Sequence, residues 1–410
     1  MTKFVARQPI FDCGKNIFAY ELLFRSSLDN FFRSDQPDNA SSSVMVDSFL
    51  LLGMKSLTGG RKAFLNVTRN LLMQQYVTLL PQEQAVVEIP EDVRVDESLL
   101  MACRGLKQKG YLIVLDDFAW QNEANPLVGL ADIIKVDFLK TPPGIRRQMV
   151  ERFNPLGIKM LAEKVETHDD FREAVKLGYT YLQGFFFCRP EILSIREVPA
   201  FKLNYLSLLH ALNRADIDFA EVERVIKREA SLCYKLLRYL NSAAFYFCGE
   251  INSIRHALSL LGLSEIRKWA SLVAMADMGK DKPAALVITS MVRARFCETL
   301  APLAGFAQRA TEIFLMGLFS VMDAILEKPM VEILQELPLS RDVKEALTGG
   351  KGCFQWIYEL STCYECGDWQ KIGETAATLK LSEQAISEAY IQAVKWAHEI
   401  FQIDHVTVAA

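Results

Sequence analysis

Short apolar runs that end in or near a polar residue recur along the first half of the chain. The runs are Asn16–Glu21, Ala63–Asn66, Ala85–Glu88, Leu112–Asp117, Ile133–Asp137, Met160–Glu163 and Tyr181–Gln183. A carboxylate on an apolar strand costs free energy unless it belongs to a site. In a parallel βα barrel the carboxyl ends of the strands converge at one mouth. The pattern therefore predicts strands whose polar ends build one active site.

The segments between these runs have apolar residues at helical spacing. Examples are Ser42–Leu52, Leu99–Lys107 and Phe171–Leu177, the last two followed by the helix-ending glycines Gly110 and Gly178. Strand–helix–strand units in series predict a parallel sheet.

The chain begins differently, with two strands joined by a short turn. Phe4–Phe11 and Asn16–Phe24 have strand character, and Asp12–Asn16 between them is rich in turn-forming residues. The two strands are expected to form a hairpin, so the first is antiparallel. With eight strands in total, we predict an α/β fold of the modified TIM-like (β/α) barrel type.

The apolar period changes at the junction Pro190–Pro199, and strand signals nearly vanish beyond it. The helical segments predicted there are 202–212, 219–240, 252–277, 283–304, 308–327, 354–368 and 382–402. The sequence thus predicts a barrel domain over 1–195 and an all-α domain over 196–410.

Composition narrows the functional classes. The net charge of the 410 residues is −4, without a long run of one sign, which argues against nucleic acid or a membrane surface as partner. No uncharged apolar stretch reaches the roughly 18–20 residues of a membrane-spanning helix. The 9 scattered cysteines and the absence of a secretory signal predict reduced thiols and a cytoplasmic protein.

The predicted strand ends carry a metal-binding set. Glu21, Asn66, Glu88 and Asp116 offer hard oxygen ligands, which suit Mg²⁺ or Mn²⁺ better than zinc. Asp117 allows a second cation. Two bridged cations can activate water and stabilise the leaving oxygen of a phosphodiester. Three further residues assist: Lys135 to hold water or phosphate, Glu163 to orient or accept a proton, and Gln183 to position water or substrate.

The same residues lie in motifs that resemble the EAL domain family. The motifs are Gln8-Pro-Ile10, Tyr20-Glu21-Leu-Leu-Phe-Arg25, Phe64-Leu-Asn66, Glu88-Ile-Pro-Glu91, Asp116-Asp117-Phe118, Lys135-Val-Asp137, Ala162-Glu163-Lys-Val-Glu166 and Gln183-Gly184-Phe185. They follow the order of the family and cover about residues 4–190.

The resemblance implies a modified TIM barrel that hydrolyses cyclic di-GMP to pGpG with two Mg²⁺ or Mn²⁺ ions. By the same resemblance Glu21, Asn66, Glu88, Asp116 and Asp117 are the metal ligands. Lys135 and Glu163 assist the attacking water, with Gln183 and Glu166 in support. Gln8 and Arg25 contact the nucleotide, and a guanidinium such as that of Arg25 is independently suited to phosphate.

Two departures from the family pattern lie near the predicted site. Ala119-Trp120-Gln-Asn-Glu-Ala124 replaces the glycine-containing loop that follows Asp117-Phe118 in the family, and alanine and tryptophan lack the backbone freedom of glycine. Lys164 replaces a glycine beside Glu163. The altered loop at Ala119–Asn122 leaves open whether the site is catalytic.

The second half resembles the HDOD domain family. The resemblance rests on Leu236-Leu-Arg-Tyr-Leu-Asn241-Ser242-Ala243-Ala-Phe245 and Ile251-Asn-Ser253-Ile254-Arg-His256-Ala257 through Leu263. HDOD domains resemble metal-dependent phosphohydrolases that have lost their metal ligands. Here Ser320 and Val321 lie where a His–Asp pair would be, and His210, His256 and His398 have no acidic partners at metal spacing. This half is expected to be a helical regulatory or partner-binding module.

Two hypotheses follow from the sequence. The first is a metal-dependent cyclic di-GMP phosphodiesterase in which the helical half binds a signalling protein, with a homodimer as a further expectation. The second is a catalytically inactive barrel that acts as a cyclic di-GMP receptor or as a protein-interaction scaffold. Turnover of cyclic di-GMP in the presence of Mg²⁺ or Mn²⁺ distinguishes them.

Overall fold

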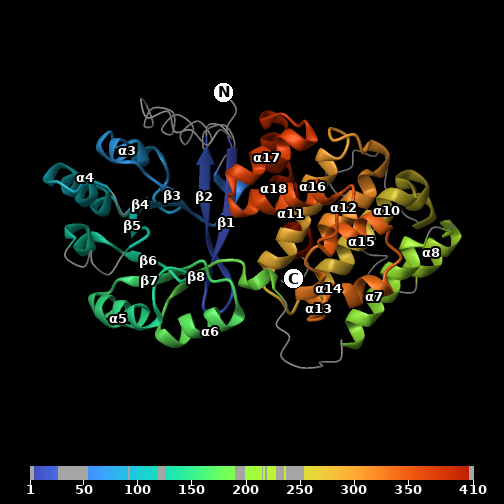
Figure 1. The fold of residues 1–410 in the computed structure, drawn as a ribbon, viewed down its shortest axis with the longest axis horizontal. Helices are drawn as coiled ribbons and strands as arrows, with labels where there is room; N and C mark the ends of the chain where they lie inside the picture. The colour runs from blue at the N-terminus through green and yellow to red at the C-terminus, as the bar shows by residue number, and fades with distance from the viewer. Residues whose placement is uncertain are drawn as a thin grey trace. The chain divides into compact units, whose positions relative to one another are not determined.

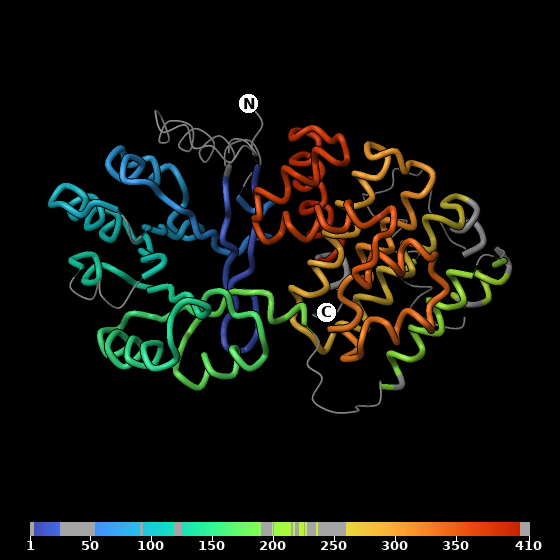
Figure 2. Tube along the Cα trace, in the orientation of Figure 1, coloured from blue at the N-terminus to red at the C-terminus, as the bar shows by residue number. Residues whose placement is uncertain are grey.

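The computed structural model describes residues 4–25, 54–90, 93–118, 125–189, 199–214, 216–217, 219–227, 235–236 and 254–405. The chain divides into two compact units. One comprises Met1–Arg189 together with Glu359–Ala410, and the other comprises Pro190–Tyr358. The first unit is thus built from both ends of the chain, which are coloured blue to green and red in Figure 2.

The first unit contains a closed barrel of eight strands in sequence order. The strands are β1 (Phe4–Asp12), β2 (Ile17–Arg25), β3 (Lys62–Asn66), β4 (Ala85–Ile89), β5 (Leu112–Leu115), β6 (Ile133–Asp137), β7 (Lys159–Glu163) and β8 (Tyr181–Gln183). β1 is antiparallel to both β2 and β8, and all other neighbours are parallel. The predicted fold class, a modified barrel with an antiparallel first strand, is confirmed.

The reversed first strand follows from the turn that joins it to β2. A carboxylate oxygen of Asp12 accepts a hydrogen bond from the backbone N–H of Asn16 at 2.9 Å. Lys15 adopts a left-handed conformation with φ 63°. A turn this short forms a hairpin and leaves no room for a crossover helix. The outer face of β1 and β2 therefore needs a cover from elsewhere in the chain.

Each strand contributes one apolar side chain to the same layer inside the barrel. The layer consists of Ile10, Ala19, Phe64, Val86, Val114, Ile133, Leu161 and Tyr181. Successive residues of a strand alternate between faces, so the residue two positions further along points inward again. The register of the strands therefore determines which residues form the next layer toward the mouth of the barrel. The side chains of that layer are polar.

Helices and 3₁₀ turns connect the parallel strands (Figure 1). They are α2 (Met54–Thr58), α3 (Arg69–Met73), η1 (Tyr76–Leu79), α4 (Glu97–Gln108), η3 (Pro126–Leu130), α5 (Pro143–Phe153), η4 (Asn154–Leu156) and α6 (His168–Leu177), and η5 (Phe186–Cys188) follows the last strand. α6 shows why they form where the sequence places them. Thr167 and Asp170 make a capping box at its start, and Gly178 with φ 99° ends it.

The last helices of the chain cover the hairpin of β1 and β2. They are the end of α16 (Gln355–Cys366), α17 (Trp369–Leu379) and α18 (Glu383–His405). The rings of Phe4 and Trp369 meet edge to face with centroids 6.0 Å apart, and α18 contacts β1, as the red and blue elements of Figure 1 show. This grouping differs from the predicted helical domain over 196–410, because the hairpin lacks a covering helix of its own.

The second unit is helical, as predicted. Its helices are α7 (Ala200–Asn213), α8 (Phe219–Lys227), α10 (Ile254–Met278), α11 (Ala284–Leu300), η6 (Ala307–Arg309), α12 (Ala310–Phe319), α13 (Met322–Leu326), α14 (Met330–Glu336), α15 (Arg341–Leu347) and the start of α16. Gly262 interrupts α10 with φ 75°. The single helix expected over 308–327 is divided into η6, α12 and α13, because the chain leaves helical geometry at Val321.

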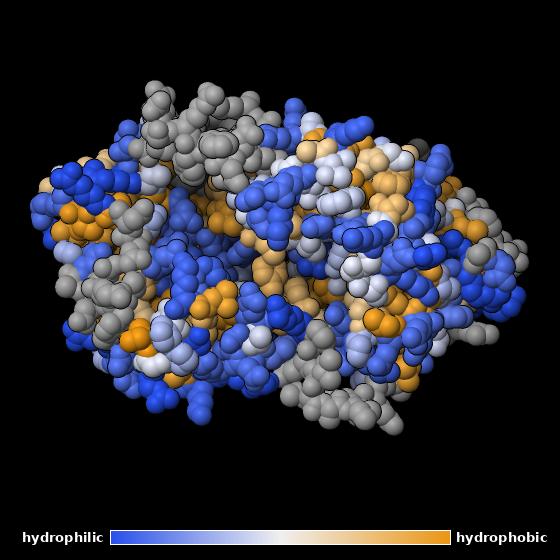
Figure 3. Space-filling view, viewed as in Figure 1, coloured by the Kyte–Doolittle hydropathy of each residue, from blue (hydrophilic) through white to orange (hydrophobic). Residues whose placement is uncertain are grey.

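Large hydrophobic residues are exposed at several places on the surface. Leu79, Met101, Leu139 and Leu156 are more than half exposed, and small groups of hydrophobic residues lie among hydrophilic ones on the face shown in Figure 3. Among the residues that the structure describes, no helix combines the length and apolar character needed to cross a membrane.

Candidate active site

A ring of polar side chains lies directly above the apolar layer of the barrel. In each parallel strand the member of the ring lies two residues after the residue of the apolar layer. In the antiparallel β1 it lies two residues before it, and Asp116 is the first residue after the end of β5. The ring consists of Gln8, Glu21, Asn66, Glu88, Asp116, Lys135, Glu163 and Gln183. The structure therefore brings together most of the residues that the sequence predicts for the site, and register explains why.

Lys135 is the electrostatic centre of the ring. Its ammonium group lies 3.0 Å from a carboxylate oxygen of Asp116 and 3.3 Å from one of Glu21. It also contacts Glu88 and Glu163 directly. The side chain of Lys135 is only 1% exposed. Burial alone would lower the pKa of Lys135, but the surrounding carboxylates outweigh it and raise that pKa well above its usual range.

Glu21 is held from both sides of its carboxylate. Asn66 donates its amide to Oε1 at 3.2 Å, and Gln183 donates to Oε2 at 2.6 Å. Oε2 also faces Lys135. These contacts fix the orientation of the carboxylate before any ligand arrives, which is what preorganisation of a site requires.

The ring holds more negative charge than its own lysine can balance. Lys135 faces four carboxylates, so the fully ionised group has an excess of three negative charges. Burial, reinforced by the charge of Glu21, raises the pKa of Glu88 well above its usual range. Burial likewise raises the pKa of Glu163 to about 7. Buried carboxylates in this state favour a cation or protons as partners.

The arrangement fits a divalent cation. Glu21, Glu88 and Glu163 each offer an oxygen, and these atoms lie within 4.8 Å of one another. Oε2 of Glu88 and Oε1 of Gln183 are buried acceptors without a hydrogen-bond partner among the described residues. Buried acceptors of this kind are uncommon. Carboxylate and amide oxygens are the ligands that Mg²⁺, Mn²⁺ and Ca²⁺ prefer.

Asp117 lies beside this ring, and its carboxylate faces Lys140 rather than Lys135. Its side chain is 52% exposed, and Lys140 is 3.9 Å from its carboxylate. The residue adopts φ 47°, a left-handed conformation. The predicted ligand of a second metal ion is thus close in sequence to Asp116 but is directed toward Lys140.

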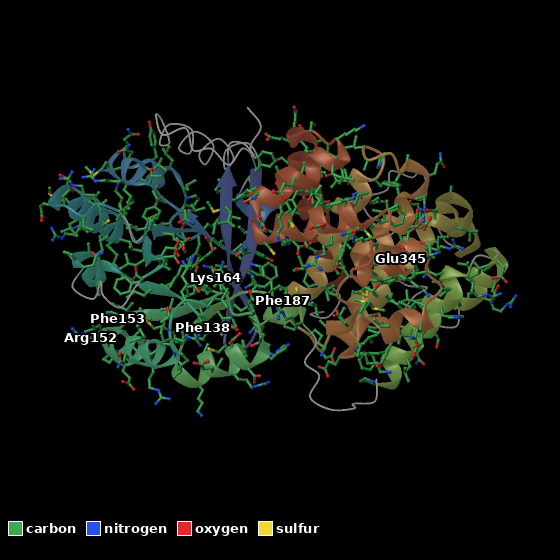
Figure 4. All side chains as sticks on the ribbon, viewed as in Figure 1. Phe138, Arg152, Phe153, Lys164, Phe187 and Glu345 are labelled. Atoms are coloured by element: carbon green, nitrogen blue, oxygen red, sulfur yellow. The ribbon has the colours of Figure 1, made fainter. Side chains whose placement is uncertain are left out.

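Lys164 occupies the mouth of the barrel next to Glu163. It is labelled in Figure 4, and its ammonium group lies 2.5 Å from Oδ2 of Asp137. Lys140 approaches the same carboxylate at 3.7 Å. Although burial acts to raise the pKa of Asp137, hydrogen bonds, chiefly from Lys164, lower it. Asp137 is therefore bound by two lysines, a pairing that the sequence did not reveal.

The remaining predicted residues lie apart from the ring. Glu166 forms a surface ion pair with Arg189 at 3.0 Å. The side chain of Arg25 and the altered loop over 119–124, which includes Ala119–Asn122, lie outside the described residues.

Gln8 joins the ring to the end of α16. Its amide donates to the backbone carbonyls of Glu365 at 3.3 Å and Cys366 at 3.2 Å. Its own oxygen accepts a hydrogen bond from Gln183 at 3.0 Å. The sequence identified Gln8, but backbone carbonyls leave no motif from which its partners could be predicted.

Arg7, the neighbour of Gln8, contacts α2 and α18 on the outer side of β1. Its guanidinium donates to the carbonyl of Leu57 at 2.7 Å and to the ring of His398 on α18, and it stacks over Tyr20. Burial, aided by the charge of Arg7, lowers the pKa of His398 to about 3. His398 is therefore a neutral core histidine.

In the helical unit, Ser320, which the HDOD resemblance aligns with a metal ligand of phosphohydrolases, has a different partner. Ser320 accepts a hydrogen bond from Arg293 at 3.1 Å, and both side chains are buried. His210 is exposed, and the side chain of His256 lies outside the described residues, as do residues 237–253 of the HDOD-like motif.

Comparisons with known proteins match both halves of the chain. The family model of the EAL domain matches residues 51–190, and that of the HDOD domain matches residues 198–336. YuxH, an uncharacterized protein of Bacillus subtilis, is 34% identical over 98% of this chain and 99% of its own length. The cyclic di-GMP phosphodiesterase CdgJ of Vibrio cholerae is 32% identical over 97% of this chain and 93% of its own.

A solved structure is similar to a smaller part of the chain than these two relatives are. The manganese and cyclic di-GMP complex of BlrP1 from Klebsiella pneumoniae at pH 9.0 covers 46% of this chain and 55% of its own, with 22% identity and a TM-score of 0.39.

Proposed function

The chain belongs to the family of proteins that join an EAL domain to an HDOD domain, and from this premise we propose that it is a metal-dependent cyclic di-GMP phosphodiesterase. The proposed reaction hydrolyses cyclic di-GMP to pGpG. The observation that carries the proposal is the buried ring in which four carboxylates surround Lys135. A relative that is similar over nearly its whole length bears the name of this activity.

We propose that the ring holds Mg²⁺ or Mn²⁺. Glu21, Glu88 and Asp116 would be carboxylate ligands, with Asn66 as an amide ligand. Asp117 would complete a second site with Asp116, which requires its carboxylate to leave Lys140. When bound, such ions lower the pKa of a bound water and stabilise the leaving oxygen of a phosphodiester.

The side chains of the chain supply the remaining functions. Lys135, buried and cationic, orients Glu21, Glu88, Asp116 and Glu163 and attracts a phosphate oxygen. Glu163 accepts a proton from water at its carboxylate. Gln183 presents its buried Oε1 to the water or substrate. Lys140 and Lys164 at the mouth attract the anionic nucleotide, and Arg25 and Glu166 contact it in line with the family pattern.

The helical unit has a regulatory role in this proposal. By the family resemblance, Ser320 and Val321 lie where a metal-dependent phosphohydrolase has a His–Asp ligand pair, and Ser320 is bound to Arg293 instead, so this unit would bind a signalling protein rather than catalyse. A homodimer is part of the same proposal.

A second function, a cyclic di-GMP receptor without turnover, is favoured by one observation. Asp117 is directed at Lys140 rather than at the ring, so a second ion would lack a ligand. A receptor would bind cyclic di-GMP in calorimetry and release no pGpG.

Turnover with a matched control separates these possibilities. Purified protein with Mn²⁺ is expected to release pGpG, and Glu21→Ala is expected to remove the activity. Glu97→Ala, a change in an exposed ion pair on α4, is expected to leave it intact. Binding of cyclic di-GMP without turnover would replace the phosphodiesterase by the receptor.

A further inference from the structure

The carbonyl groups at the end of α16 have an unusual set of partners. The last four carbonyls of a helix have no partner within it. Here the N–H groups of Asp368 and Gly367 bond to the carbonyls of Cys363 at 3.0 Å and Tyr364 at 3.2 Å. The carbonyls of Glu365 and Cys366 accept from the side chain of Gln8 instead. The side chain of Gln8, a member of the polar ring, therefore caps the C-terminal end of α16.

Gln8 has no donor left for a ligand. A glutamine amide has two N–H donors and one oxygen acceptor. Both donors are directed to the helix, and Oε1 accepts from Gln183 at 3.0 Å. The role that the family resemblance implies for Gln8, a contact with the nucleotide, would require these bonds to break.

Gln183 connects Gln8 to Glu21, the candidate metal ligand. Its amide nitrogen donates both to Oε1 of Gln8 and to Oε2 of Glu21, at 3.0 and 2.6 Å. The N–H groups of Gln8 are directed to the helix, so its side-chain oxygen faces Gln183. Gln183 must therefore direct its own N–H groups to Gln8 and Glu21. The amide of Gln183 therefore leaves only Oε1 for the interior of the site.

We propose that Gln8 is a positioning residue that couples the end of α16 to Glu21 through Gln183. The proposal rests on the proposed function in that Glu21 is the ligand whose orientation matters. Gln8 keeps the Glu21 carboxylate ready to bind a cation while α16 stays in place. α16 begins at Gln355, in the helical unit, and ends at Cys366 in the barrel unit. A partner of the helical unit that moves this helix would thereby alter the metal site.

The test measures Mn²⁺ affinity by calorimetry in the absence of nucleotide. Gln8→Leu is expected to weaken Mn²⁺ binding about 10–100-fold, the usual effect of removing a group that orients a metal ligand. A residue that only contacts nucleotide would leave this affinity unchanged, and that result would overturn the proposal. Circular dichroism and the melting temperature confirm that the variant folds.

A second variant perturbs the helix without changing the ring. Gly367 has φ 67°, and an added Cβ would lie 2.9 Å from Cδ1 of Leu23. Gly367→Val strains this left-handed backbone and displaces the end of the Leu23 side chain, so it is expected to disturb the end of α16 and to weaken Mn²⁺ binding as Gln8→Leu does. Gly305→Val is the matched control, since Gly305 has φ 85° but no atom within 4 Å of the added Cβ.

The double variant decides whether the two changes act through one pathway. If they do, Gln8→Leu combined with Gly367→Val loses no more Mn²⁺ affinity than either change alone. Independent, additive losses would contradict the coupling.

A separate readout covers the case in which the proposed function fails. If the wild-type protein bound no Mn²⁺, the phosphodiesterase proposal would fail, but the coupling would remain measurable from the side-chain amide resonance of Gln183 in protein labelled with ¹⁵N-glutamine. That resonance should shift in Gly367→Val and stay in place in Gly305→Val. An unshifted resonance in Gly367→Val would reject the coupling.

Discussion

The ammonium group of Lys135 lies 3.0 Å from the carboxylate of Asp116, and the two residues come from neighbouring strand ends in a layer of the barrel that otherwise holds carboxylates and amides. Lys135 is thus the only cation of the polar ring among the described residues. A buried charge that loses its partner destabilises a protein strongly. The stability of the barrel and the affinity of its site for cations should therefore depend on the same few side chains.

Replacement of the central cation should destabilise the metal-free protein. Lys135→Met leaves four carboxylates without a buried positive charge, and we expect it to lower the free energy of unfolding by about 3–5 kcal/mol. Urea denaturation in the presence of a chelator measures the loss. Mn²⁺ should restore part of the stability, because binding to the folded state stabilises it. A variant as stable as the wild type would show that the carboxylates are already protonated.

Neutralisation of one buried carboxylate should have opposite effects on stability and on metal binding. Glu88 is fully buried, and burial already raises its pKa. Glu88→Gln removes excess negative charge, so the metal-free protein should melt at the same or a higher temperature. Mn²⁺ affinity should fall at least about tenfold. Glu97→Gln, at an exposed position, is the control for both measurements.

The glycine after Gln183 is fixed by a close backbone approach. Gly184 has φ 149°, and an added Cβ would lie 2.1 Å from the carbonyl oxygen of Val165. Gly184→Ala must displace this backbone, so we expect a loss of about 1–3 kcal/mol in the free energy of unfolding and a loss of turnover as Gln183 moves. Gly129→Ala, where the added Cβ meets nothing within 4 Å, should change neither quantity appreciably.

The partly buried His398 of α18 should make the stability of the protein depend on pH in the acid range. The pKa of His398 is about 3 in the folded protein, against about 6.5 in an unfolded chain. The unfolded state therefore binds more protons between these values, and stability falls as pH decreases from about 6.5 toward 3, by at most about 1.4 kcal/mol per pH unit.

A comparison of variants isolates this contribution. His398→Gln cannot titrate, so its melting temperature should decrease less between pH 7 and pH 4 than that of the wild type. His210→Gln, at an exposed histidine, should follow the wild type. Parallel pH profiles for His398→Gln and the wild type would contradict the effect.

The sequence predicted the polar ring because strand alternation is a local rule. Once Ala19, Phe64 and Val86 are inward, the residues two positions later must also be inward, and these are Glu21, Asn66 and Glu88. The antiparallel first strand followed in the same way from the turn after Asp12.

Contacts between distant segments could not be predicted in this way. The sequence indicated that α18 is a helix, but nothing in its apolar spacing showed that His398 would lie against Arg7 of β1. The direction of Asp117 depends on its left-handed backbone and on Lys140, which approaches from the following strand end. Such features depend on tertiary packing rather than on periodicity.

We propose that the carboxylates around the buried Lys135 form a metal centre that hydrolyses cyclic di-GMP. The most direct test measures pGpG release by the full-length protein as Mn²⁺ is titrated, for the wild type and for Glu21→Ala. We expect release that rises with Mn²⁺ and saturates for the wild type, and none above background for Glu21→Ala. Release that is independent of Mn²⁺, or equal in the two proteins, would contradict the claim.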